Sequence, residues 1–302
     1  MSEMVDQEKV RVFPAIFSIQ RTPPLSPSDS DDQNELLRPA EWILEAIGRE
    51  FKHLGIIQIE VDSYCDAVGM LFAKATSTFL ALVALVRICH ADEASQLSRS
   101  LMNLAIDLMY MTRIGDREEN AQRFMDYGWM DAQELLERAR KVYSNRPADE
   151  ATLKAWEVHA KFVTEPFEGI RSKFEIKKGS GGAKKRRSHH WARHETIAER
   201  AKALGSPFYE HYLIGYRMLS AYEHSSQSAA LHYKRFPDQS GPVVYVAGPS
   251  HDRSNIALVV GCQYLLHAFL VFGEAFGINV ISHLVEAGQK LIDETYAKPT
   301  GA

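Results

Sequence analysis

The chain has 302 residues, of which 45% are hydrophobic and 25% charged, so it is long and apolar enough to bury a core. Its 35 basic and 39 acidic side chains give a net charge of −4, which excludes a polycation that binds nucleic acid over its whole surface. The three cysteines, Cys65, Cys89 and Cys262, are widely spaced and form no C-x-x-C pair. This pattern predicts reduced, buried thiols in a cytoplasmic protein.

The first 33 residues differ in composition from the rest of the chain. The opening "MSEMVDQEKVRV" lacks the apolar segment of a signal peptide. The stretch "RTPPLSPSDSDDQN", residues 21–34, is rich in Pro, Ser and Asp, which predicts a flexible arm. The longest apolar run, residues 79–86, is much shorter than the about 20 residues that span a membrane. We therefore expect a core helix there and no membrane partner.

Helical spacing of apolar residues begins at Glu35 and continues through most of the chain. Asn34 is expected to cap the first helix, which should stop at Gly55. A long helix that is apolar almost all round is predicted over residues 64–90, and such a helix is normally buried. The next one should run over residues 92–114, with Asp92 as its cap.

The second half of the chain continues the helical pattern, with one loop. Two helices are predicted over residues 116–174, where Pro166 should kink or end the second. Residues 177–194 then contain seven Lys or Arg, three His and three Gly but no acid, which predicts a basic loop. Further helices are expected over residues 207–224 and 254–276.

The predicted fold is all-α, a single helical bundle over residues 34–302 behind a flexible arm over residues 1–33. At most a small β-hairpin is expected, near residues 241–249, where "GPVVYVAGP" has strand character. The expected core includes Phe72, Phe79, Val83, Leu101, Leu104, Leu108, Leu265 and Phe269.

One helical stretch, "YRMLSAYEHSSQSAALHY", carries an unusual polar face. Arg217, Ser220 and His224 recur at i, i+3 and i+7, which places them on one side of a helix. A histidine can move protons near neutral pH, and an arginine can hold a phosphate through two hydrogen bonds. The two lie about 10.5 Å apart along a helix axis. The alternative is a structural face, with His224 bonded to the backbone and Arg217 paired with an acid.

Two blocks of the sequence resemble a bacterial family called domain of unknown function 5677. "LSRSLMNLAIDLMYM" (Leu97–Met111) is similar to the family's first helix, which has an early arginine, here Arg99, and an aliphatic-Asp-Leu-x-Tyr ending. "HWARHETIAERAKALGSPFYEHYLIGYRMLSAYEHSS" is similar to its second block, which ends in Leu-Ser-x-x-x-His. The resemblance covers roughly residues 60–275. Asn103 stands where the family pattern has an acid.

A looser resemblance suggests a function. An arginine followed, after six residues, by a histidine near the end of a bundle helix resembles the active motif of the higher-eukaryote-and-prokaryote nucleotide-binding (HEPN) superfamily. That resemblance implies a helical bundle, often a homodimer, and a metal-independent ribonuclease of a toxin or phage-defence system. It implies catalytic roles for Arg217, His224, Ser220 and Arg99, with no metal or other cofactor. Met218 departs from the motif, which has a polar residue after the arginine.

The basic loop is the candidate RNA-binding segment. Phosphates would be held by Lys184, Lys185, Arg186 and Arg187, and Trp191 would stack on a base. The alternatives are a solvated loop and a tryptophan that anchors the loop to the bundle. Likewise, Arg99 could join the Arg217 face or pair with Asp107 in a buried network.

Two functions therefore stay open at this stage. In the first, the protein binds RNA or cleaves it as a metal-independent endoribonuclease. In the second, it is a non-enzymatic helical interaction module that binds a partner protein. The first requires Arg217 and His224 to share a solvent-accessible cleft, whereas the second allows both side chains to be buried.

Overall fold

A computed structural model describes residues 31–54, 62–143, 150–176, 186–187, 190–194, 196–216, 218–219, 234–235, 244–245 and 254–296. It confirms the all-α class. The helices are α1 (Asp31–Leu54), α2 (Ser63–Arg87), α3 (Ala91–Arg113), α4 (Arg117–Tyr143), α5 (Glu150–Ile170), α6 (Ile197–Leu204), α7 (Phe208–His211), α10 (Ser254–Phe276) and α11 (Val280–Tyr296). Short 3₁₀ and π-helical turns lie at Arg171–Phe174 and Tyr212–Tyr216.

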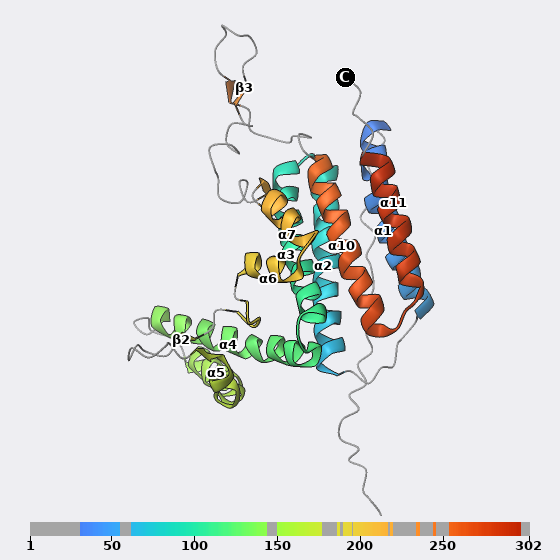
Figure 1. The fold of residues 1–302 in the computed structure, drawn as a ribbon. Coiled ribbons are helices and arrows are strands. Elements are labelled where there is room, and N and C mark those ends of the chain that lie inside the picture. The colour runs from blue at the N-terminus through green and yellow to red at the C-terminus, as the bar shows by residue number, and fades with distance from the viewer. Residues whose placement is uncertain are drawn as a thin grey trace, which may run out of the picture.

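Helices α2, α3 and α10 form the centre of the bundle, and α1 and α11 lie side by side against α10 (Figure 1). All eight residues predicted for the core are buried here. Gly261 allows α10 to approach α2 closely, because a Cβ atom at this position would lie 2.8 Å from Leu82 Cδ1. The Ser98 hydroxyl also donates to the Ala257 carbonyl across the α3–α10 contact, at 2.7 Å.

Helices α2 and α10 are also long and apolar enough to cross a membrane, judged by length and composition alone. Their buried side chains include Phe72, Phe79 and Phe269, which form part of the bundle core. Cys65 and Cys262 are buried as predicted, whereas Cys89 is half-buried, and all three are free thiols. Burial raises the pKa of the Cys65 thiol to about 12, so it stays protonated at neutral pH.

Two boundary predictions need correction, and a third can be narrowed. Helix α1 begins at Asp31, so Asn34 lies inside it. Helix α3 begins at Ala91 after a turn in which Cys89 has φ 62°, so Asp92 lies in its first turn and His90 takes the cap position. Helix α5 runs through Pro166 and ends four residues later, where a 3₁₀ turn follows. A proline lacks only one backbone donor, and packing of the flanking turns can hold such a helix together.

Two short antiparallel strand pairs are present in addition to the helices. The pair β3 (Lys234–Arg235) and β4 (Val244–Tyr245) includes the segment predicted near residues 241–249. The second pair, β1 (Glu175–Ile176) with β2 (Arg186–Arg187), was not predicted. It corrects the expectation that residues 177–194 form a loop throughout, because Arg187 lies opposite Glu175 and Arg186 opposite Ile176.

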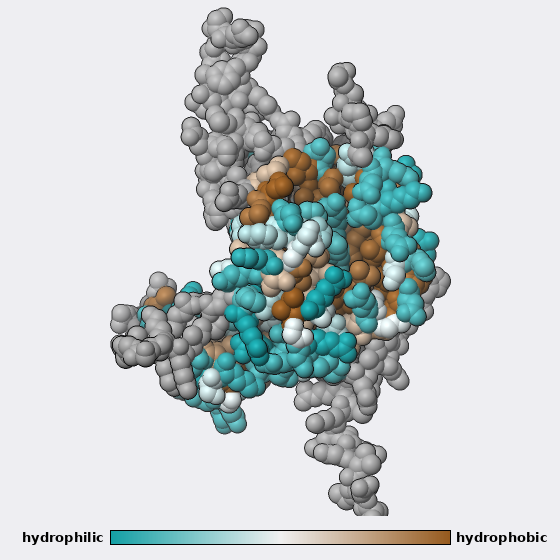
Figure 2. Space-filling view, in the orientation of Figure 1, coloured by the Kyte–Doolittle hydropathy of each residue, from teal (hydrophilic) through white to brown (hydrophobic). Residues whose placement is uncertain are grey.

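Helices α4 and α5 form a hairpin that extends away from the α1, α10 and α11 side of the bundle (Figure 1). The hairpin has a small core of its own, formed by Met130, Phe167, Ile170 and Phe174. The surface in Figure 2 mixes hydrophilic and apolar areas, with apolar surface over the upper part of the bundle and along α10. The segment that follows α7 also exposes apolar side chains. Leu213, Ile214 and Met218 are the exposed apolar residues of that segment.

Candidate functional site

A polar stripe follows one face of α3. Arg99, Asn103 and Asp107 are spaced by one helical turn each, and Tyr110 continues the line. This face is turned toward α6 and the Tyr212–Tyr216 segment, both of which contact α3. The stripe therefore lies where the two sequence blocks of the family resemblance meet.

At one end of the stripe, Arg99 contacts Tyr216. The guanidinium carbon lies 4.3 Å from the centre of the Tyr216 ring, and Nη2 donates a hydrogen bond to the tyrosine hydroxyl. The segment runs close to α3, because a Cβ atom at Gly215 would lie 3.0 Å from Met102 Cε. Arg99 is thus held against the residue that immediately precedes Arg217.

Several predicted site residues lie outside the described part of the chain. These are Arg217, Ser220, His224, Lys184 and Lys185. Arg186 and Arg187 are described only through the backbone of β2. Of the predicted site side chains, Arg99 and Trp191 are described.

Asp107 pairs with Arg200 of α6 and not with Arg99, so the proposed Arg99–Asp107 pair is wrong. The Arg200 Nε atom lies 2.7 Å from Asp107 Oδ1, and the two side chains are 5% and 17% exposed. Two helical turns separate Arg99 from Asp107, about 12 Å along α3, which is too far for a direct pair. Burial raises the pKa of the Asp107 carboxyl to about 6, although the charge of Arg200 opposes this rise.

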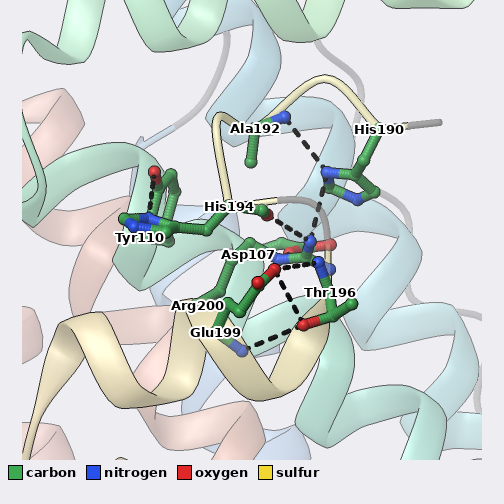
Figure 3. A network of polar contacts seen from close by, with 8 residues as sticks. All are labelled: Asp107, Tyr110, His190, Ala192, His194, Thr196, Glu199 and Arg200. Carbon is green, nitrogen blue, oxygen red and sulfur yellow. Dashed lines mark hydrogen bonds and ion pairs between the residues drawn. The ribbon is translucent and has the colours of Figure 1, made fainter. Parts of the chain in front are cut away.

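Arg200 also ties the ion pair to the segment before α6 (Figure 3). Its Nη1 atom donates to the His194 carbonyl at 3.0 Å and lies 3.2 Å from His190 Nδ1. The Ala192 N–H donates to the same His190 nitrogen, at 3.0 Å. Because both neighbours of Nδ1 are donors, we assign the ring proton of His190 to Nε2.

At the Tyr110 end of the stripe, aromatic side chains of the segment before α6 pack against the bundle. The Tyr110 hydroxyl lies 2.9 Å from His194 Nδ1, and the His194 ring is exposed. Trp191 is only 4% exposed, and the edges of Tyr110 and Phe124 pack against it. Arg123 Nε further donates to the Trp191 carbonyl, at 3.0 Å. Trp191 therefore anchors the segment to the bundle, which is one of its two roles expected from the sequence, and its buried ring does not fit the other role, stacking on a base.

We expect Tyr110→Phe to lower the free energy of unfolding by about 0.5–1.5 kcal/mol, because it removes one hydrogen bond and leaves the buried ring in place. Urea denaturation of the two proteins measures the difference. Tyr209→Phe is the matched control, since no hydrogen bond is formed by the Tyr209 hydroxyl within the described structure. Equal losses in the two variants would contradict a stabilising Tyr110–His194 bond.

Exposed basic residues surround the anchored segment. Arg193 pairs with Glu119 at 2.7 Å, and Lys173 pairs with Asp126 at the same distance. The β1–β2 pair places the backbone of two further arginines next to the 3₁₀ turn that carries Lys173. The Arg193–Glu119 pair is exposed on both sides, and exposed pairs contribute only about 0–1 kcal/mol, so a phosphate group can replace Glu119 as the partner of Arg193.

Sequence reasoning missed the residues that hold this end of the stripe: Arg200, Tyr110, His190 and His194. The clearest signal was Asp107, an acid flanked on both sides by apolar residues that needed a basic partner. Arg200 was hard to identify because it lies in a short amphipathic helix with other charged residues. Across the described residues, no group of three or more His, Cys, Asp or Glu is arranged to hold a metal ion.

The chain was compared with known families and proteins. A family model described as "Family of unknown function (DUF5677)" matches residues 66–240, which is more than half of the chain. The chain belongs to this family. The DUF5677 match includes α3 and the α6–Tyr216 region, and therefore both ends of the polar stripe, and it stops before α10. No curated protein and no solved structure matches the chain.

Proposed function

We propose that this DUF5677 protein binds single-stranded RNA and cleaves it without a metal ion. The observation that supports this most directly is the contact between Arg99 and Tyr216, since it brings the arginine of the first block against the helix of the second. The π-helical turn at Tyr212–Tyr216 also supports a site here, because such turns are frequent at functional sites. An activity of this kind would suit a toxin or phage-defence effector in the cytoplasm.

Cleavage of RNA requires a proton to leave the 2′-hydroxyl, a proton to reach the leaving oxygen and the phosphate charge to be neutralised. In the proposal, His224 carries protons and Arg217 binds the phosphate. Ser220 positions the reacting groups through a hydrogen bond. Arg99 adds positive charge from α3, and Tyr216 orients its guanidinium.

The RNA strand would extend from this helix to the basic segment, outside the α3–α6 contact that covers the polar stripe. Arg99 and Tyr110 are eleven residues apart, which corresponds to about 16 Å along α3. Beyond Tyr110 the strand would meet Arg193 and the basic run Lys184–Arg187. The anchoring of Trp191 supports this path, because it holds the exposed His194 and Arg193 in place beside the bundle.

We expect a variant with Lys184, Lys185, Arg186 and Arg187 all changed to Ala to bind RNA far more weakly than the wild type. If four phosphates are contacted, wild-type affinity should fall about 50-fold between 50 and 200 mM salt, and the variant should lose this dependence. Fluorescence anisotropy with a labelled single-stranded RNA measures both quantities.

The matched control changes four exposed basic residues elsewhere to Ala: Lys52, Arg138, Arg140 and Lys290. It alters the net charge equally but leaves the proposed path intact, so its affinity should stay near that of the wild type. If the two variants bind alike, or if the wild type does not bind RNA at low salt, the RNA proposal is wrong. The non-enzymatic interaction module then becomes the better interpretation.

A further inference from the structure

The outward face of α5 carries large apolar side chains that no described residue covers. Val158 is 67% exposed and Phe162 is 65% exposed, and a shallow depression lies along this face. An adjacent side of the helix packs on α4 through Val163, Phe167 and Ile170. An edge-to-face contact with Trp129 also holds the Phe162 ring at the surface. The face is therefore formed and apolar before any partner binds.

Charged residues flank the apolar pair in a self-complementary order. Lys154 lies one turn before Val158, and Glu165 lies about one turn after Phe162, all on the same side of α5. If two copies of α5 pack antiparallel about a two-fold axis near residue 160, each Val158 faces the other copy's Phe162. Each Lys154 then lies within about one residue, or about 1.5 Å along the axis, of the other copy's Glu165.

We infer that this face of α5 is a homodimer interface, in which a second copy of the chain packs antiparallel on Val158 and Phe162. A two-fold interface requires a patch that is complementary to itself, and the order Lys, apolar, apolar, Glu meets this requirement. A single helix pair buries less than the about 800 Å² per partner of a standard interface. The dimer should therefore form in the micromolar range. This inference does not depend on the RNA proposal.

Analytical ultracentrifugation of the full chain over a range of micromolar concentrations tests the interface. We expect a monomer–dimer equilibrium in the wild type and a monomer at all concentrations for Val158→Asp and Phe162→Asp, since each buries two carboxylates at the contact. Val280→Asp, on exposed α11 surface, is the matched control and should dimerise normally. Circular dichroism confirms that each variant is folded.

A charge exchange tests the register of the two helices. Lys154→Glu and Glu165→Lys should each raise the dissociation constant about tenfold, because both symmetry-related pairs become repulsive. The double variant restores two opposite-charge pairs and should return to the wild-type constant. A monomeric wild type, a dimer that persists in Phe162→Asp, or a double variant weaker than both single ones would overturn the proposal.

Discussion

Replacing Arg200 by methionine is expected to lower the free energy of unfolding by about 3–5 kcal/mol at neutral pH. The substitution leaves the Asp107 carboxylate buried without its positive partner. It also removes the N–H group that donates hydrogen bonds to the His194 carbonyl and to His190 Nδ1. Methionine fills a similar space, so the loss reports mainly on the polar contacts. Chemical denaturation of the wild type and the variant measures the difference.

The penalty of Arg200→Met should depend on pH in a defined direction. In the wild type, folding raises the pKa of Asp107 from its ordinary value of 3.8 to about 6, so the native state favours the protonated carboxyl. The stabilising contribution of this raised pKa is fully present below pH 3.8, and it is lost as the pH rises through about 6. Without Arg200 the pKa should rise further. The variant should therefore be closest to the wild type in mild acid and furthest from it in mild alkali.

Arg193→Met is the matched control for this experiment. Arg193 also pairs with an acid, Glu119, but its side chain is 68% exposed. We expect it to lose no more than about 1 kcal/mol, as exposed pairs usually do. A second comparison uses Arg200→Met together with Asp107→Leu, which should recover much of the stability because no buried charge remains. If this double variant is as unstable as Arg200→Met, an unpaired carboxylate is not the cause.

The second large effect concerns the proposed cleavage of RNA. We expect His224→Ala to reduce the single-turnover rate by about 10²–10⁴-fold, the usual contribution of a general acid or base. Arg217→Ala should reduce it by about 10²–10³-fold through the loss of charge stabilisation. Both rates are measured with a labelled RNA in the presence of a chelator, since the proposed reaction uses no metal ion.

Two controls separate catalysis from binding and folding. His283→Ala removes an exposed histidine of α11 and should leave the cleavage rate unchanged. Anisotropy measurements should show that His224→Ala still binds RNA near the wild-type affinity. Unchanged cleavage in both His224→Ala and Arg217→Ala would exclude this helix as the site. If RNA binding then persists, the protein is an RNA-binding protein without this activity.

The helices and the core could be predicted from the sequence because their signals are local. The apolar residues of α2, α3 and α10 repeat at helical spacing, and all eight predicted core residues are buried. Helix ends were less predictable, since Asn34 and Asp92 are good caps that the structure places inside helices. A capping residue competes with the packing of the adjacent turn, and that packing depends on the rest of the fold.

The candidate site shows most clearly which features follow from the sequence and which depend on the tertiary structure. The sequence by itself determined that α3 carries Arg99, Asn103 and Asp107 on one face, because helical periodicity places them there. Only the tertiary structure decided their partners: Tyr216 for Arg99, and Arg200 for Asp107. It also buried Trp191 and paired β1 with β2. Such contacts join residues far apart in the chain and require atoms to come within a few ångströms of each other. They therefore depend on how the helices pack, and they leave no repeating pattern in the sequence.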